Sequence, residues 1–394
     1  MIRCCWMASL AALAFAAAGC RQSLVGPQPN QGGQEAQQTT PDEAYVRGVE
    51  FLLQHQNEDG SWGSFESARP GEIYRGTTAS FRAFRDATTA LCVMALLEPS
   101  RENPAVHAAL QRGVEQMLAV EPVGRATPTT FYNTWAHTYR LRAMAQLLLD
   151  GRFVDQEEKL RQAIDAELAF LLPLQGLDGG WGYYDFSQGT SPPSGIQSTS
   201  FNTSSVVVAL HAVKRAGVPV DARVLRDAVR CISRMRLPSQ AYVYGTQHLH
   251  IAGANFNQVK GSLARMQPCN YALWLEGEGV DLAVMANGLN LLREHHHFLD
   301  IAYGRPRPHE AWYQNSGYYY LYGHSYAAVV ASTVGGEEGS EFLQWQSDLL
   351  TRRQNPEGSW YDFPMYGYHR AYGTALALLA LQEALAADPT ATAR

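Results

Sequence analysis

The sequence predicts an all-α fold, an (α/α)6 toroid in which six helical hairpins form an inner and an outer ring. Three observations lead to this prediction. A short pattern, Gln-x-x-x-Gly-x-Trp, recurs along the chain, apolar residues return at helical spacing in twelve segments, and these segments alternate between two compositions. We expect the toroid to occupy residues 41–394.

The repeated pattern starts at Gln56, Gln175 and Gln354. These positions are separated by about two and three times 60 residues, so a unit of roughly that length recurs with its intermediate copies degraded. Because the first and last units both keep the intact pattern, we expect the ring to close. Each copy also has a Leu four residues before the Gln and an acid just before the Gly: Leu52, Leu171 and Leu350, and Asp59, Asp178 and Glu357.

Helical spacing of apolar residues predicts the individual elements in chain order. Consecutive segments pair into six hairpins, with the Gly-x-Trp turns lying between the two members of a pair. The expected helices are 43–56, 86–98, 104–119, 132–149, 155–174, 201–216, 222–236, 258–276, 281–303, 317–334, 338–354 and 366–386.

Composition separates the two rings. Segments that follow a Gly-x-Trp turn are rich in small residues, as in 87–91, 203–206 and 373–377, and small side chains permit tight packing on all sides. We therefore expect the inner ring to include 86–98, 201–216 and 366–386. The preceding segments, such as 161–174, carry one apolar stripe and one charged face, which is typical of outer helices.

The repeat resembles that of the squalene–hopene and oxidosqualene cyclases and of the protein prenyltransferase β subunits. In this family it is called the prenyltransferase and squalene oxidase repeat. Residues 47–52, Arg-Gly-Val-Glu-Phe-Leu, match its fuller form, and Arg-Gly-Val-Glu recurs at 112–115. The resemblance implies an α/α toroid in which the Gln packs on the Trp ring and caps the following inner helix. These residues are then structural, and none is expected in an active site.

The first 20 residues have the pattern of a targeting signal. Arg3 precedes an apolar run through Ala18, and the segment closes in Ala-Ala-Gly-Cys at Cys20. This ending predicts cleavage and lipidation of Cys20, which gives a membrane-anchored lipoprotein on the periplasmic side of a bacterial envelope. An ordinary secretory signal is the alternative. Residues 21–40, rich in Gln, Gly and Pro, are expected to form a flexible tether.

Charge and cysteine usage narrow the function further. The formal net charge is −6, so nothing basic points to a nucleic-acid partner. After the signal, Cys92, Cys231 and Cys269 form an odd set without paired spacing, and we expect buried thiols rather than a disulfide framework.

Acid catalysis has only weak candidates. The Asp-x-Asp-Asp motif by which class II terpene cyclases protonate an alkene or epoxide is absent. Asp185 and Asp362 each stand in Tyr-Asp-Phe after a Gly-x-Trp turn, and their equivalent repeat positions favour helix capping over catalysis. His324 is the remaining candidate for a catalytic residue.

We expect no metal and no cofactor. His369 in Tyr-His resembles the zinc histidine of the prenyltransferase β subunits, but the Asp-x-Cys element that should precede it is missing. The 295–297 run of His is expected on the solvated face of an outer helix, where successive side chains diverge by about 100°. His248 and His250, in a long loop at 237–260, leave open an alternative metal site.

The chain has 20 Tyr and eight Trp, and many of them cluster near the expected starts of inner helices. A cavity lined by Tyr suits a ligand with an apolar body and some polar decoration, although the same rings could simply fill the centre. The clusters are 318–326, 366–372, Tyr242 with Tyr244, and Tyr132 with Trp135 and His137. The residues predicted to bind ligand are Arg265, Tyr318, Tyr322, His324, Tyr368, His369 and Tyr372.

Two functions follow from these features. The first is an envelope protein that binds an apolar or amphiphilic, isoprenoid-like molecule, with Arg265 as a charged anchor for a carboxylate or phosphate. The second is a terpene cyclase-like or lyase-like enzyme that uses the non-standard acids Asp185, Asp362 or His324. A filled centre would instead indicate an interaction scaffold, and the sequence predicts no particular protein partner.

Overall fold

The computed structural model describes residues 39–66, 78–124, 133–183 and 198–387, which we call the described residues. Cys20, Tyr132 and Asp185 lie outside them. The described residues belong to one compact unit that starts at Thr39. None of the helices in these ranges has the length and apolar character needed to cross a membrane.

Within the described residues, six outer and six inner helices alternate along the chain. The outer helices are α1 (Pro41–Gln54), α3 (Pro104–Ala119), α5 (Glu157–Leu171), α7 (Ala222–Met235), α9 (Leu282–Glu294) and α12 (Gly336–Arg353). The inner helices are α2 (Thr78–Leu97), α4 (Asn133–Asp150), α6 (Ser200–Arg215), α8 (Val259–Leu275), α11 (Tyr320–Val334) and α13 (His369–Ala387). A short helix, α10 (His297–Asp300), follows α9.

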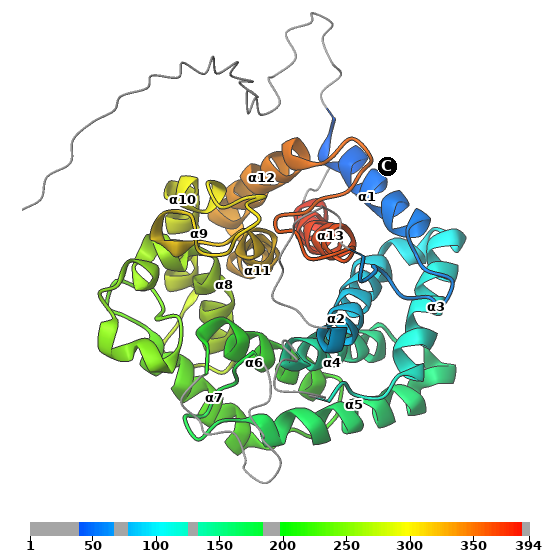
Figure 1. Ribbon diagram of the computed structural model, residues 1–394, viewed down its shortest axis with the longest axis horizontal. Coiled ribbons are helices and arrows are strands. Elements are labelled where there is room, and N and C mark those ends of the chain that lie inside the picture. The colour runs from blue at the N-terminus through cyan, green and yellow to red at the C-terminus, as the bar shows by residue number, and fades with distance from the viewer. Residues whose placement is uncertain (1–38, 67–77, 125–132, 184–197, 388–394) are drawn as a thin grey trace, which may run out of the picture. The chain divides into compact units, whose positions relative to one another are not determined.

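The predicted (α/α)6 toroid is confirmed. Each inner helix packs against the next, in the order α2, α4, α6, α8, α11 and α13, and α13 packs against α2 (Figure 1). The outer helices surround this ring, and α1 contacts both α12 and α13. The last hairpin is therefore joined to the first, and the ring of helices is closed.

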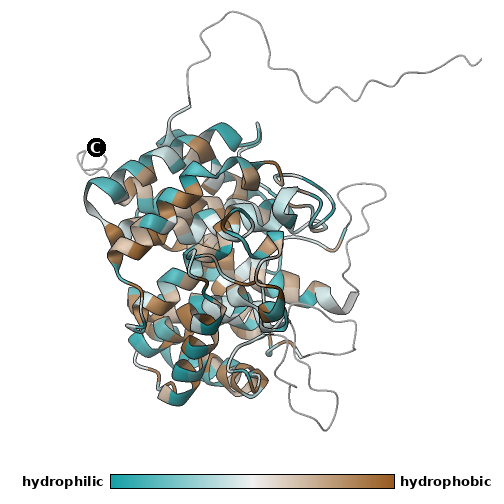
Figure 2. Ribbon diagram, turned by 90° about the vertical axis from the view of Figure 1, so that its left-hand side faces the viewer, coloured by the Kyte–Doolittle hydropathy of each residue, from teal (hydrophilic) through white to brown (hydrophobic). Residues whose placement is uncertain are grey.

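The two rings differ in burial as their compositions predict. Almost every residue of α6 from Ser200 to Leu210 is buried, including its Ser, Thr and Asn side chains. In the outer helix α7, by contrast, burial is restricted to one stripe, which includes Leu225, Val229 and Ile232. Hydrophilic and hydrophobic positions alternate on the outer helices seen in Figure 2. Inner helices thus contribute core on all sides, and outer helices shield them from water.

The Trp of each repeat joins the outer and inner helices of its own unit. Its indole N–H donates to the last turn of the outer helix, and its backbone N–H donates to a Thr hydroxyl of the following inner helix. The indole nitrogens of Trp62, Trp181 and Trp360 lie 2.8, 3.0 and 2.8 Å from the carbonyl oxygens of Leu52, Leu171 and Leu350. The Thr residues are Thr89, Thr203 and Thr374.

The Gln of each repeat joins its unit to the next one. Its amide donates to the Gly carbonyl of its own turn and to a carbonyl of the next outer helix. The amide nitrogens of Gln56, Gln175 and Gln354 lie 2.8, 2.9 and 2.8 Å from the carbonyl oxygens of Ala109, Val224 and Ala44. These bonds run to outer helices, whereas the resemblance implied that the Gln caps the following inner helix.

The Gly of the repeat is required by backbone approach. Gly358 has φ +94°, and a Cβ there would lie 2.5 Å from the carbonyl oxygen of Arg47. Gly48, in the Arg-Gly pair at the other side of the same junction, sits under the Trp360 ring, where a Cβ would come within 2.7 Å. The Arg-Gly pair of one unit therefore provides the surface on which the Trp ring of the preceding unit packs.

Most helix boundaries agree with the sequence prediction to within a few residues, with two exceptions. Helix α2 starts at Thr78, eight residues before the expected 86. The segment 281–303 divides into α9 and α10 because the helix breaks at the 295–297 run. Cys92, Cys231 and Cys269 are buried free thiols, as predicted.

Candidate functional site

An aromatic cavity lies at the N-terminal ends of the inner helices. It comprises about 700 Å3 of space free of protein atoms, including the part open to solvent. Of the twelve described residues that line it, nine are aromatic, and Asn202 and Ser205 are the polar ones among the other three. The lining residues are Phe84, Trp135, Tyr183, Phe201, Asn202, Ser205, Tyr318, Tyr319, Tyr322, Phe363, Met365 and Tyr372, and we call this set the aromatic cavity.

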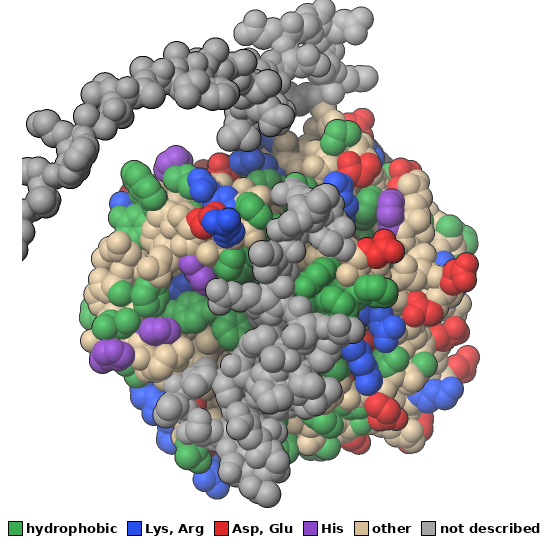
Figure 3. All heavy atoms as spheres, in the orientation of Figure 1, with side chains coloured by type: hydrophobic (Ala, Val, Ile, Leu, Met, Phe, Trp, Pro, Cys, Tyr) green, Lys and Arg blue, Asp and Glu red, His purple; other side chains and the backbone are tan. Residues whose placement is uncertain are grey.

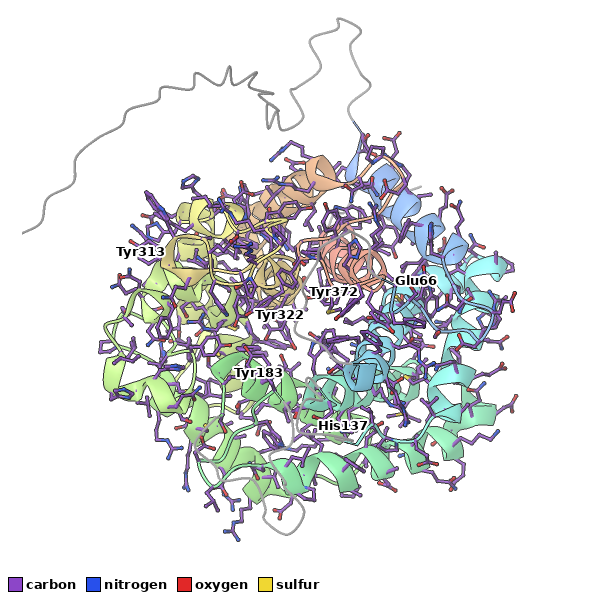
Figure 4. The ribbon with its side chains drawn as sticks, in the orientation of Figure 1. Glu66, His137, Tyr183, Tyr313, Tyr322 and Tyr372 are labelled. Carbon is purple, nitrogen blue, oxygen red and sulfur yellow. The ribbon has the colours of Figure 1, made fainter. Side chains whose placement is uncertain are left out.

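Side chains from inner helices that are not direct neighbours in the ring meet around this cavity. Tyr183, Tyr322 and Tyr372 surround the middle of the ring in Figure 4. The Phe201 ring of α6 meets the Tyr322 ring of α11 edge-on, with centroids 6.2 Å apart, and the Trp135 ring of α4 lies 5.6 Å from that of Tyr372 on α13. On the face drawn in Figure 3, hydrophobic side chains gather around the centre.

Four of the five Tyr hydroxyls of the aromatic cavity are hydrogen-bonded within the protein, and that of Tyr319 is not. Tyr322 donates to the carbonyl of Phe201 at 3.0 Å, and its hydroxyl lies 2.9 Å from the Ser205 hydroxyl. Tyr372 donates to the carbonyl of Tyr318 at 3.4 Å, which places the two predicted Tyr clusters side by side. Burial raises the pKa of Tyr322 and Tyr372 well above that of a free phenol. The rings are thus held rigidly, and mainly apolar surface faces the cavity.

A second cavity, which we call the Arg265 pocket, adjoins the first. It comprises about 540 Å3 including open solvent, and Tyr319 lines both cavities. Arg265 itself is only 2% exposed, and its guanidinium lies 5.4 Å from the ring centre of Tyr244. The lining residues of the Arg265 pocket are Tyr244, His248, Phe256, Arg265, His309, Gln314 and Tyr319.

Four of the seven predicted ligand-binding residues therefore line a cavity. Tyr318, Tyr322 and Tyr372 line the aromatic cavity, and Arg265 lines the pocket beside it. The other aromatic cluster that had been expected to face inward is divided, because Trp135 lines the cavity and His137 points to the outer helix α5 (Figure 4).

His324 lies away from both cavities. It is two residues after Tyr322 on α11, so it faces the outer ring, where its Nε2 lies 3.1 Å from Nε2 of His296. Burial lowers the pKa of His324 well below its usual range, and its ring packs near Trp345 of α12. The expectation of a solvated 295–297 run is wrong for His296, which is half-buried in this contact, and burial lowers its pKa to about 4.

Tyr368 and His369 also lie outside the two cavities. Tyr368 is 3% exposed, and its ring packs 6.0 Å from that of Phe84. The Nδ1 atom of His369 bonds to the carbonyl of Tyr366, and its ring meets Tyr361 edge-on. In the described part of the chain, no group of three or more His, Cys, Asp or Glu side chains is arranged to hold a metal ion.

Asp362 acts at a helix terminus. Its Oδ2 accepts the backbone N–H of Leu321 at 2.7 Å, in the first turn of α11, while Oδ1 has no hydrogen-bond partner among the described residues. Burial raises the pKa of the carboxyl to about 7, against the lowering effect of backbone hydrogen bonds from Leu321 and Phe363. Asp362 lines neither cavity, although its neighbour Phe363 lines the aromatic one.

A buried ionic network connects three helices beside the aromatic cavity. Glu167 of α5 lies 2.5 Å from both Nδ1 of His137 and Nε of Arg140 on α4, and Arg140 lies 3.8 Å from Asp86 of α2. All four side chains are at most 2% exposed. Burial raises the pKa of Asp86 despite the nearby arginines. Because none of the four lines either of the two cavities described above, we assign the network to helix packing.

The sequence did not single out Phe84, Tyr183, Phe201, Phe363 and Met365 as ligand-binding residues. Each lies near the start of an inner helix or directly after a Gly-x-Trp turn, which was the same position that marked the Tyr clusters. The sequence feature that predicts a cavity-lining residue is therefore its position within the repeat. Residue type alone does not show which side of a helix that is buried on all sides faces the centre.

Sequence comparison does not assign a family. No protein-family model matches the chain, and no curated protein does either. Solved structures do match. An α-1,6-mannanase of glycoside hydrolase family 76 from Salegentibacter has a TM-score of 0.55 and 9% identity, with 88% of this chain and 100% of that chain covered.

Two other enzymes match to a similar degree. A type II terpene cyclase from Scytonema has a TM-score of 0.52 and 14% identity, with 87% of this chain and 96% of that chain covered. A cellobiose 2-epimerase from Bacillus thermoamylovorans has a TM-score of 0.52 and 9% identity, with coverages of 87% and 98%. At these identities the likeness shows the α/α toroid and leaves the chemistry to the site.

Proposed function

We propose that the protein binds a molecule with an apolar, isoprenoid-like body in the aromatic cavity. The observation that carries this proposal is the lining itself, in which nine of twelve residues are aromatic and the Tyr322 and Tyr372 hydroxyls are occupied by protein partners. Mostly apolar walls with a few polar groups are usual for small-molecule sites.

Burial of apolar surface in such a cavity gives enough free energy for ligand binding, whether or not the protein is a catalyst. Removing apolar surface from water stabilises a complex by about 25 cal/mol per Å2, so a ligand that buries about 300 Å2 gains on the order of 7 kcal/mol. Ordering and association costs reduce this gain. Micromolar affinity is the expected outcome.

An apolar ligand fits the lining better than a sugar does. A sugar ring needs several hydrogen-bonding groups around it, and the described part of the lining offers Asn202 and Ser205 as its non-aromatic polar side chains. The Asn202 amide already donates to the carbonyl of Gly182 at 2.6 Å. A toroid of this kind can hold such a ligand: a type II terpene cyclase from Scytonema with 13% identity and a TM-score of 0.51 was solved with geranylgeranyl dihydroxybenzoate as its substrate.

The second candidate is a cyclase-like or lyase-like enzyme, and Asp362 is the residue that favours it. A buried carboxyl with a pKa of about 7 and a free Oδ1 has the properties of a general acid. Its contact with Leu321 and its position behind the cavity wall favour capping instead. Asp185, the equivalent residue of the earlier repeat, lies outside the described residues.

One experiment separates binding from catalysis. Purified protein is titrated with squalene or geranylgeraniol while Trp fluorescence is recorded, and the ligand is then extracted and identified by mass spectrometry. We expect saturable micromolar binding and recovery of unchanged ligand. Cyclised or cleaved product, abolished in Asp362→Asn or Asp185→Asn, would establish the enzyme; absence of binding by any apolar ligand would leave an interaction scaffold.

The cavity assignment is tested by filling it. Ser205→Leu places a larger side chain in the lining and should weaken binding at least about tenfold, because the inserted methyl groups occupy ligand volume. The matched control is Tyr326→Phe, one turn beyond Tyr322 on α11 and outside both cavities. It should bind as wild type does. Equal loss in both variants would argue for general destabilisation.

We also propose that the protein is held at a bacterial envelope membrane by lipid on Cys20, on the basis of the Ala-Ala-Gly-Cys ending of its signal-like segment. Metabolic labelling with radioactive palmitate should label wild type and fail to label Cys20→Ser. Labelling of both, or of neither, would contradict this anchor.

A further inference from the structure

The Arg265 pocket contains a buried positive charge without a counter-ion. Arg265 is 2% exposed, and among the described residues it forms no ion pair with a carboxylate. Its guanidinium donates instead to the neutral backbone carbonyls of Gly261, Phe256 and Tyr242, at 2.7, 2.6 and 3.1 Å. A buried charge is stable only where other groups replace its hydration, and here the pairing with an anion is missing.

Hydrogen-bonding groups without partners converge on the same pocket. Nε of Arg265 and Nδ1 of His248 are both buried and have no hydrogen-bond partner among the described residues. The Tyr319 hydroxyl is also buried and makes no hydrogen bond of ordinary geometry, although Tyr244 lies next to it. Buried polar atoms are nearly always bonded, so three such atoms in the lining of one pocket indicate a missing ligand group. All three can donate a hydrogen, which an anion accepts.

The charge of the pocket suits a monoanion. None of the described residues that line it is acidic. Burial lowers the pKa of both His248 and His309, and the nearby Arg265 lowers it further. Both rings are therefore neutral near pH 7, and Arg265 supplies one positive charge. A single carboxylate balances this charge, whereas a phosphate monoester would leave negative charge buried.

We propose that the Arg265 pocket binds the carboxylate of an amphiphile whose apolar body occupies the aromatic cavity. This inference rests on the proposed function and specifies its ligand. Tyr319 lines both cavities, so a single molecule can place its acid beside Arg265 and its apolar chain against Tyr322 and Phe201. Tyr319 and His248 complete the hydrogen bonds of the carboxylate oxygens.

The backbone that carries part of the pocket supports this assignment. Five non-Gly described residues have positive φ, and His309, Tyr313 and Gln314 are three of them. His309 and Gln314 line the pocket. Such conformations cost of order 1–3 kcal/mol each and are found preferentially at ligand sites, where the surrounding structure holds them in place.

The test uses two probes with the same apolar chain, geranylgeranoic acid and geranylgeraniol, titrated into the purified protein at pH 7 by calorimetry. We expect the acid to bind at least about tenfold more tightly than the alcohol. Geranylgeranyl monophosphate is the third probe, and it should bind more weakly than the acid. A preference for the phosphate would overturn the carboxylate assignment.

Variants then test whether the preference for the acid arises in the Arg265 pocket. Arg265→Gln should bring the affinities of acid and alcohol to within about twofold of each other. Because Arg265 also donates hydrogen bonds to three carbonyls, the folding of the Arg265→Gln variant is checked by near-UV circular dichroism. His248→Gln serves as a second variant, which should reduce the preference for the acid without removing it. His250→Gln is the matched control, since His250 is exposed and outside the pocket. It should keep the full preference for the acid.

The outcomes distinguish this inference from the proposed function. Equal affinity for acid and alcohol in wild type would overturn the carboxylate subsite and leave the aromatic cavity standing. If neither probe binds, the proposed function fails, and benzoate is then titrated at millimolar concentration while the His ring signals are followed by NMR. Shifts at His248 and His309 but not at His250 would sustain the anion site by itself, and their absence would overturn it.

Discussion

The side-chain amide of Gln354 donates a hydrogen bond to the backbone carbonyl of Ala44, 310 positions earlier in the chain, at 2.8 Å. The same nitrogen donates to the carbonyl of Gly358 at 2.9 Å. Gln56 and Gln175 make equivalent pairs of bonds to the units that follow them. One device therefore both joins successive hairpins and closes the ring on its first helix.

The repeat Trp residues should carry a large share of stability. Trp181 is 1% exposed, so Trp181→Ala leaves a large cavity and should lower the free energy of unfolding by about 3–5 kcal/mol. The control is Trp312→Ala, because Trp312 is 69% exposed and should cost less than about 1 kcal/mol. Denaturant unfolding measures both. A loss below about 1 kcal/mol for Trp181→Ala would refute its structural role.

The repeat Gly should be irreplaceable at the ring closure. In Gly358→Ala the new Cβ meets the Arg47 carbonyl, and the positive φ adds strain, so we expect a loss of more than about 2 kcal/mol. Gly277→Ala isolates the strain, since Gly277 has φ +71° and nothing within 4 Å of the added Cβ. It should cost about 1 kcal/mol. Similar losses in thermal unfolding would show that the close approach is unimportant.

Asp362 should make the protein less stable as pH rises. Its folded pKa of about 7 exceeds the unfolded value of 3.8, because burial disfavours the charged form, so the folded state holds a proton that the unfolded state releases between these values. The contribution to unfolding free energy is full below pH 3.8 and is lost as pH rises through 7, by up to about 4 kcal/mol.

Asp362→Asn provides the measurement. The amide oxygen keeps an acceptor for the Leu321 N–H and carries no charge, so the variant should be more stable than wild type at pH 8 and similar to it at pH 4. Urea unfolding at both pH values decides the point. A variant that is less stable at pH 8 would show that the carboxylate is required in its charged form.

The His296–His324 pair should produce the opposite slope. Burial lowers the pKa of His296 from 6.5 to about 4, so the unfolded state binds a proton that the folded state excludes. This contribution to unfolding free energy is present above pH 6.5 and is lost as pH falls through 4, by about 1–3 kcal/mol. His296→Gln should therefore reduce the acid sensitivity of unfolding, whereas His297→Gln, at an exposed neighbour, should leave it unchanged.

The sequence predicted the ring because its evidence was periodic. The recurrence of Gln, Gly and Trp located the turns, and the small-residue segments identified inner helices such as α6 and α13. The candidate site was less accessible. On a helix buried on every side, hydrophobic periodicity does not distinguish the face toward the cavity from the face toward the outer ring, which is why His324 was grouped with Tyr322 although the two point in different directions.

Contact between α1 and α13 makes the first hairpin a neighbour of the last, as any other two consecutive hairpins are. In structural terms the ring has no privileged starting unit. A circular permutant that joins the ends of α13 and α1 by a short linker and opens the chain at an exposed turn, such as Gly277, would keep every junction between hairpins intact. The order of the units along the gene is therefore separable from their order around the cavity.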